Sequence, residues 1–208
     1  MDFSSFINNI DHIKTAEIGG LASQFRLAPK MQLNYNAEKI AASNPKKAAV
    51  LALFYPNKKG ETCFLLTQRA SYNGTHSAQI SFPGGKIEKS DKNLIETALR
   101  ETFEEVGVLK DKITVVREIT DVYIPPSNFL ATPFIAYTNK KPNFITNHEV
   151  DHAFDVLLKD LLDDHNITSI NITTSYAKNI DVPCFKLNNY IVWGATAMIL
   201  NEIKELLK

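Results

Sequence analysis

The chain of 208 residues is long enough for one domain with a sizeable core, and its 44% of hydrophobic residues exclude a disordered chain. A formal net charge of zero argues against general nucleic-acid binding, which needs a basic surface. No apolar run approaches the ~20 residues that span a membrane. The N-terminal segment carries charges where a secretory signal is apolar, and both cysteines, Cys63 and Cys184, stand in apolar runs. We therefore expect a cytoplasmic protein with buried free thiols.

Residues 1–46 are expected to form a helix and an arm that pack on the main domain, which takes residues 47–208. Apolar residues at helical spacing predict an amphipathic helix within residues 1–20: Phe3, Phe6, Ile7, Ile10 and Ile13. Residues 21–46 are more polar, contain the breakers LAPKM and ASNPKK, and predict an extended arm. Core packing is expected of the helix, with a membrane or partner contact as the alternative. The arm is a candidate contact for a homodimer.

Apolar and β-branched runs predict strands, and periodic segments predict helices. The expected strands span residues 48–55, 62–67, 79–82, 113–119, 131–137, 168–173, 184–187 and 189–193. The expected helices span residues 92–106, 156–163 and 195–207. Residues 121–130 and 139–153 are expected to be loops because prolines and asparagines interrupt them. This order of elements predicts an α/β fold in which helices cover both faces of a mixed sheet.

The stretch from residue 81 to residue 108 is the most informative part of the sequence. Gly84 and Gly85 follow Pro83, and adjacent glycines allow a ligand to approach the main chain closely. A polar loop comes next, where Ser90 or Asp91 is a candidate helix cap. The helix that follows ends at Gly107, which suits a left-handed C-terminal residue.

Three carboxylates of this helix, Glu101, Glu104 and Glu105, fall in one sector of about 100° on a helical wheel. The opposite, buried stripe is expected to contain Ile95, Ala98, Leu99, Thr102, Phe103 and Val106. Like charges in one sector repel, and a hard cation such as Mg²⁺ or Mn²⁺ would relieve that repulsion. A backbone carbonyl of Gly85 is a further candidate ligand. The alternative is a solvated acidic face, but the glycine turn directly before the helix favours a metal site.

The residues RETFEEVGV, 100–108, resemble the end of the Nudix box, G-x5-E-x7-R-E-U-x-E-E-x-G-U, in which U is apolar. The chain departs from the box in three ways. The loop between Gly85 and Arg100 is one residue longer, Lys92 stands where the box has Glu, and Thr102 occupies a usually apolar position.

The residues LLTQRASYNGTHSAQISFPGGKIEKSD, 65–91, resemble the signature of the coenzyme A diphosphatase branch of that family, roughly LLTxRSxxLRxHxGQxxFPGGxxExxD. The matching positions are Leu65, Leu66, Thr67, Arg69, His76, Gln79, Phe82, Pro83, Gly84, Gly85, Glu88 and Asp91. The departures are Ala70, Asn73, Gly74 and Ala78. Gly74 replaces a basic residue, although the phosphates of coenzyme A attract cations.

The resemblance implies a Nudix fold, an α/β/α sandwich, and hydrolysis of a diphosphate joined to another group. It implies that Glu101, Glu104 and Glu105 hold the metal together with Gly85, and that Arg100 keeps the glutamates in place. Glu149 is the candidate loop acid, ahead of Asp151, and either a loop acid or one of the three glutamates would be the general base. The expected contacts with a small nucleotide substrate are Arg69, His76, Gly84, Gly85 and Lys86. Tyr72, Tyr123 and Phe129 are candidates for stacking on adenine, with core packing as the alternative.

Coenzyme A or an acyl derivative is the expected substrate, with 3′,5′-ADP and 4′-phosphopantetheine or its acyl form as products. One alternative keeps the chemistry and changes the substrate to ADP-ribose, NADH or a nucleoside triphosphate. Another is a catalytically silent domain that binds a nucleotide. The complete set of carboxylates favours an enzyme over a silent domain, because a binding module does not need the metal ligands.

Overall fold

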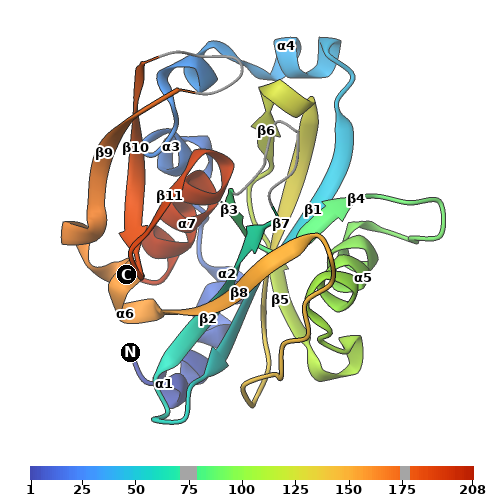
Figure 1. Ribbon diagram of the computed structural model, residues 1–208, viewed down its shortest axis with the longest axis vertical. Coiled ribbons are helices and arrows are strands. Elements are labelled where there is room, and N and C mark those ends of the chain that lie inside the picture. The colour runs from blue at the N-terminus through green and yellow to red at the C-terminus, as the bar shows by residue number, and fades with distance from the viewer. Residues whose placement is uncertain (71–78, 174–178) are drawn as a thin grey trace.

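The computed structural model describes residues 1–70, 79–173 and 179–208, and a mixed β-sheet forms its centre (Figure 1). The main path of the sheet runs β3-β2-β1-β7-β5, while β4 pairs with β1, β6 with β7 and β8 with β2. β1 and β7 are parallel, and the other pairs are antiparallel. The strands are β1 (Lys46–Pro56), β2 (Thr62–Arg69), β3 (Ile80–Ser81), β4 (Gly84–Lys86), β5 (Thr114–Glu118), β6 (Val122–Ile124), β7 (Phe129–Tyr137) and β8 (Val150–Leu157).

Helices lie on both faces of this sheet, which confirms the predicted α/β sandwich. Helix α5 (Leu94–Val106) lies on one side in Figure 1, and α7 (Gly194–Leu206) lies on the other. A small second sheet accompanies α7 and consists of β9 (Ile167–Ile172), β10 (Ile180–Leu187) and β11 (Tyr190–Trp193). Within the described residues, no helix is both long and apolar enough to cross a membrane.

Strand β1 divides the core into two parts because its side chains alternate between the two faces. Leu51 and Leu53 pack with Ala98 and Val106 of α5. Ala52 and Phe54 face the other way and belong to the larger cluster that contains α7. Cys63 and Cys184 are buried free thiols, as predicted.

The N-terminal segment contains more helix than the sequence predicts. Two short helices, α1 (Phe3–Asn8) and α2 (Ile10–Thr15), stand in place of one, and the side chains of Phe6 and Ile13 are fully buried. The expectation of an extended arm is wrong. Residues 21–46 contain most of α3 (Gly20–Phe25), a 3-10 helix (Lys30–Asn34) and α4 (Ala37–Ala42). Side-chain caps explain part of this, since Asn36 accepts the backbone N–H of Lys39 at 2.9 Å and so begins α4.

Two expected loops contain strands, and one expected helix is shorter than predicted. Val122–Ile124 forms β6 because it pairs with the start of β7 across a 3-10 turn at Pro125–Ser127. Residues 150–157 form β8 along β2, so helix α6 (Leu158–Leu162) begins two residues later than the predicted helix. β8 pairs with β2, which is distant in sequence, and β6 pairs with β7 across a turn. Local strand propensity does not reveal such pairing.

Helix α5 agrees with the prediction in its end and differs in its buried face. Gly107 adopts the left-handed conformation, with φ of 74°, and closes the helix as expected. Ile95 and Phe103 are exposed rather than buried, at 38% and 49%, whereas Thr97 and Glu105 are buried. The buried face is therefore rotated toward the carboxylates.

We expect Phe6→Ala to lower the free energy of unfolding by about 3–5 kcal/mol, because it empties a fully buried site. The ring of Phe6 stacks on Phe54 of β1 with centroids 5.0 Å apart, so the substitution removes a contact with the central sheet. Urea denaturation measures the change. Leu109→Ala, at a side chain that is 52% exposed, is the control and should change the same free energy by less than about 0.5 kcal/mol. Equal small effects would mean that the N-terminal helices do not belong to the cooperative core.

Candidate active site

The sheet, α5 and the N-terminal arm enclose a cavity of about 890 Å³. Its polar end is lined by β4 and by the charged face of α5. Its more apolar end is lined by the arm, by β6 with the turn after it, and by the start of α7. A cavity of this size with a few polar groups is the usual form of a small-molecule site. The polar end contains most residues that the sequence singles out: Arg69, Gly84, Gly85, Lys86, Arg100, Glu101, Glu104, Glu105 and Glu149.

Arg100 ties this polar end together. Its Nε and Nη2 donate to the two carboxylate oxygens of Asp91, each at 2.9 Å. Nη1 donates to Glu101 Oε1 and to Glu104 Oε2 at 3.0 Å each, and Nη2 also donates to the carbonyl oxygen of Lys86 at 3.1 Å. The hydrogen bonds from Arg100 are the main cause that holds the pKa of Asp91 below its usual range. Arg100 therefore connects β4, the following loop and two carboxylates of α5.

Asp91 does not cap the helix, although the sequence makes it a candidate. Asn93 is the cap, and its Oδ1 accepts the backbone N–H of Glu96 at 2.9 Å. Helix α5 begins at Leu94, later than predicted, which leaves Asp91 in the loop. There it accepts hydrogen bonds from Arg100 and, at 2.9 Å, from the hydroxyl of Thr97.

Glu101 lies directly against the backbone of Gly85. A Cβ atom on Gly85 would stand 2.5 Å from the carboxyl carbon of Glu101, so glycine leaves the room that this carboxylate occupies. Burial raises the pKa of Glu101, and the positive charge of Arg100 opposes that rise. The carboxylate is thus partly desolvated at the wall of the cavity.

Glu105 is the most enclosed of the three carboxylates, with 4% of the residue exposed. Its Oε2 accepts the backbone N–H of Gly84 at 3.1 Å, and its Oε1 lies 3.8 Å from Nη1 of Arg69. Burial raises the pKa of Glu105 to about 7, the charges of Glu101 and Glu149 add to the rise, and Gly84 and Arg69 oppose it. A nearby cation would stabilise the charged form of such a group.

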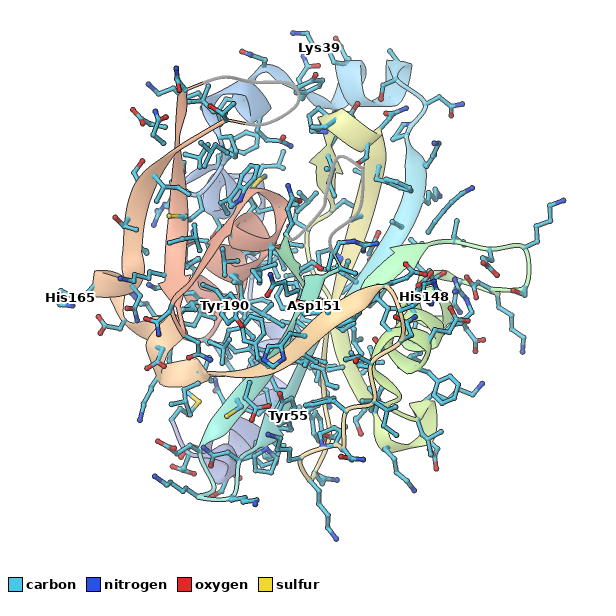
Figure 2. All side chains as sticks on the ribbon, viewed as in Figure 1. Lys39, Tyr55, His148, Asp151, His165 and Tyr190 are labelled. Atoms are coloured by element: carbon cyan, nitrogen blue, oxygen red, sulfur yellow. The ribbon has the colours of Figure 1, made fainter. Side chains whose placement is uncertain are left out.

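Arg69 joins Glu105 to the loop acid Glu149. Its Nη2 lies 3.6 Å from Glu149 Oε2, and the side chain of Glu149 is 51% exposed. The backbone N–H of Ala70 donates to the carbonyl oxygen of Glu149 at 2.8 Å and holds the loop near the end of β2. Figure 2 labels His148 and Asp151, which mark the course of this segment from the side of α5 into β8. Glu149 lines the cavity, whereas Asp151 does not line it.

Three other residues are expected to contact the substrate: Gly84 and Lys86, which lie at the polar end, and His76, which is not described. Lys86 is exposed on β4 at the polar end, and its carbonyl oxygen accepts from Arg100. Gly84 donates to Glu105 and lies too close to the backbone of Ala49 for a side chain. His76 lies outside the described residues, as do Tyr72 and Gly74.

The structure also brings residues to the cavity that the sequence analysis does not single out. Tyr35 and Lys39 reach it from the arm, and Trp193 reaches it from the end of β11, just before α7. No local motif marks these residues. They line the cavity because the arm folds over β6 and α7, which is a tertiary feature.

The polar end fits a divalent cation by the chemistry of its side chains. Mg²⁺ and Mn²⁺ prefer carboxylate and carbonyl oxygens, and three glutamates of one helix line this end of the cavity, two of them partly desolvated. Across the described ranges, no three His, Cys, Asp or Glu side chains form a preassembled metal group. Arg100 instead holds oxygens of Glu101 and Glu104.

Comparison with known proteins agrees with this geometry. The family model of the NUDIX domain matches residues 45–170, which contain the sheet from β1 to β8, helix α5 and the charged residues of the polar end. The match covers more than half of the chain. The protein therefore belongs to the NUDIX domain family.

Relatives with this domain include plant and bacterial proteins. The chain is 34% identical over 163 residues to Nudix hydrolase 15, mitochondrial, of Arabidopsis thaliana, which covers 75% of this chain and 56% of the relative. It is 29% identical over 166 residues to the uncharacterized Nudix hydrolase NudL of Yersinia pestis. That alignment covers 79% of this chain and 81% of the relative. The chain spans about half the length of the Arabidopsis relatives, at 56% and 53%.

Solved structures show the same fold. The NUDIX domain of Shewanella oneidensis NrtR, complexed with ADP ribose, aligns with a TM-score of 0.55 at 17% identity, over 85% of this chain and 96% of that one. A MutT/nudix family protein from Enterococcus faecalis aligns with a TM-score of 0.53 at 14% identity, over 85% of this chain and 71% of that one. At these identities the likeness concerns the fold alone.

We expect Gly85→Ala to reduce the rate of the hydrolysis that we propose below by about a hundredfold or more, because the added methyl displaces the Glu101 carboxylate. Initial rates with magnesium would measure the loss, and the melting temperature would report on the fold. Gly60→Ala is a control for stability alone. Nothing lies within 4 Å of a Cβ atom there, but a φ of +76° strains an alanine, so this variant should lower the melting temperature and keep the wild-type rate per folded molecule. Full activity of Gly85→Ala would show that the position of Glu101 does not matter for the reaction.

Proposed function

We propose that this protein is a magnesium- or manganese-dependent hydrolase of coenzyme A or its acyl derivatives. It cleaves the diphosphate linkage and releases 3′,5′-ADP and 4′-phosphopantetheine or the acyl form. The observation that carries the proposal is the group of glutamates on α5, pressed against the glycines of β4 at one end of a long cavity. Membership of the NUDIX family supports diphosphate chemistry, and the signature in residues 65–91 favours coenzyme A within that chemistry.

The metal, when bound, supplies neutralisation of phosphate charge and activation of water. Glu101, Glu104 and Glu105 would hold it, together with the backbone of Gly85. Arg100 keeps the carboxylates oriented through its contacts with Glu101, Glu104 and Asp91. On these glutamates Arg100 contacts only Oε1 of Glu101 and Oε2 of Glu104, so the second oxygen of each carboxylate is available to a cation.

Glu149 is the residue that we assign as general base. Its side chain is half exposed at the cavity, so water reaches it, and Arg69 holds it by an ion pair of 3.6 Å. A carboxylate in that place accepts a proton from the attacking water at Oε1 or Oε2. Arg69 and Lys86 flank the same end and supply positive charge for the substrate diphosphate.

A hydrolysis panel tests the substrate. The compounds are coenzyme A, an acyl-coenzyme A, ADP-ribose, NADH and a nucleoside triphosphate, each with Mg²⁺ or Mn²⁺ and with mass identification of the products. We expect the highest kcat/KM for coenzyme A or its acyl form, with release of 4′-phosphopantetheine or acyl phosphopantetheine, and loss of turnover when EDTA removes the metal. Preference for ADP-ribose or NADH would overturn the substrate and keep the chemistry. Ligand binding without turnover of any compound would favour a silent binding domain.

Glu104→Gln and Glu105→Gln should each reduce kcat by about a hundredfold or more, because each removes a charge that the metal needs. Both variants should keep the circular dichroism spectrum and cooperative unfolding of the wild type. Glu96→Gln is the control on the same helix, outside the cavity. Near-full turnover of either site variant at saturating magnesium would refute the metal-site assignment.

A further inference from the structure

The apolar end of the cavity has an aromatic wall built from two distant parts of the chain. Tyr35 comes from the arm and Tyr123 from β6, and both line the cavity. Their ring centroids lie 5.1 Å apart, with the rings tilted by 58°. Tyr123 is buried and its hydroxyl donates to Asn128 Oδ1 at 3.0 Å, whereas Tyr35 is half-buried. The half-buried ring of Tyr35 is therefore the more accessible face for a ligand, and the buried ring of Tyr123 supports it from β6.

Hydrogen bonds fix this wall to the rest of the domain. The side-chain amide of Gln32 donates to the carbonyl oxygen of Tyr123, which joins the arm to β6. On α7, the fully buried carboxylate of Glu202 accepts from the backbone N–H of Gly20 at 3.0 Å and from Gln24 Nε2 at 2.9 Å. The same carboxylate accepts from the hydroxyl of Thr120 at 2.5 Å, just before β6. The wall is therefore preorganised rather than a loose flap.

A cation stands beside the aromatic wall. Lys39 of α4 lines the cavity, and its Nζ donates to the neutral carbonyl oxygen of Asn34 at 3.0 Å. Lys39 makes no ion pair with any residue in the described part of the chain. Arg69 and Arg100, at the polar end, are both paired with carboxylates. Figure 2 shows Lys39 at the end of the molecule formed by α4, away from His148, which lies by α5.

We propose that the arm forms a recognition subsite for the nucleotide half of the substrate, with Tyr35 and Tyr123 against the base and Lys39 on a ribose phosphate. Aromatic side chains bind the face of a base, and an unpaired ammonium group binds a phosphate that lies beyond the scissile diphosphate. The pantetheine half offers neither a planar ring nor a charge to these residues. This inference rests on the proposed function and places residues 1–46 within the catalytic unit.

The subsite also accounts for a departure from the coenzyme A signature. Gly74 replaces a basic residue, so the positive charge for the 3′-phosphate has to come from another position. Lys39 supplies it from the arm. Lys86 remains available to the diphosphate, because it lines the polar end beside the glutamates and is exposed there.

The test compares coenzyme A with dephospho-coenzyme A, which lacks the 3′-phosphate. In Lys39→Met, the ratio of kcat/KM for coenzyme A to that for dephospho-coenzyme A should fall about tenfold, as expected for loss of one charged hydrogen bond. Lys58→Met, in the exposed hairpin turn after β1, is the matched control and should keep the wild-type ratio. Tyr35→Leu should lower kcat/KM for both compounds about tenfold and leave the ratio unchanged. A constant ratio in Lys39→Met, or wild-type kcat/KM for both compounds in Tyr35→Leu, would overturn the subsite.

A binding measurement separates this inference from the proposed function. Calorimetry without divalent metal compares the affinity of wild type and Lys39→Met for 3′,5′-ADP and for 5′-AMP. We expect Lys39→Met to weaken 3′,5′-ADP about tenfold more than 5′-AMP. If the wild type binds 3′,5′-ADP in this way but does not cleave coenzyme A, the proposed function fails and the subsite stands. If coenzyme A is cleaved and Lys39→Met binds both nucleotides as the wild type does, the subsite fails and the function stands.

Discussion

The geometry of the site depends on the guanidinium of Arg100. A planar fork of donors reaches Asp91 with two hydrogen bonds and still contacts Glu101 and Glu104, which lie on neighbouring turns of one helix. A lysine has no such fork and would leave at least one of these carboxylates without its partner. Asp91 in turn accepts the backbone N–H of Glu88 at 2.9 Å, so the loop between β4 and α5 is closed on the same arginine. The acidic face therefore keeps one shape although its charges repel.

The central strand β1 supports the site from below the cavity and is fixed by its neighbours on the sheet. β1 pairs with β2, β4 and β7, and its side chains reach both parts of the core. Ala48 and Val50 from the same strand line the cavity. Residues on a strand that is fixed on both faces move little, so the glycines of β4, which pair with it, hold a constant distance from α5. The rigidity of this strand comes from burial on both of its faces.

The sequence predicts the fold well where the signals are local. The glycine pair, helix α5 and its end at Gly107 follow from residue types at fixed spacing, and the resemblance to the Nudix box leads to the same helix. The helical wheel predicts the wrong burial for Phe103 and Glu105, because it assigns apolar residues to the interior. In the structure Phe103 is exposed, and the carboxylate of Glu105 is buried at the wall of the cavity. Strands β6 and β8 depend on pairing partners, and helix α3 of the arm packs on α7. A single sequence contains no direct sign of such contacts.

The bond between Gly20 and Glu202 joins residues that are 182 positions apart. A contact between residues so far apart closes a large loop of the chain. The conformational entropy lost in that closure opposes the contact, so such contacts form late in folding. The glutamate face of α5 and the turn before it lie close in sequence and need no such closure. We therefore expect the order of folding to separate the two ends of the cavity, with the glutamate face of α5 formed early and the aromatic wall formed late.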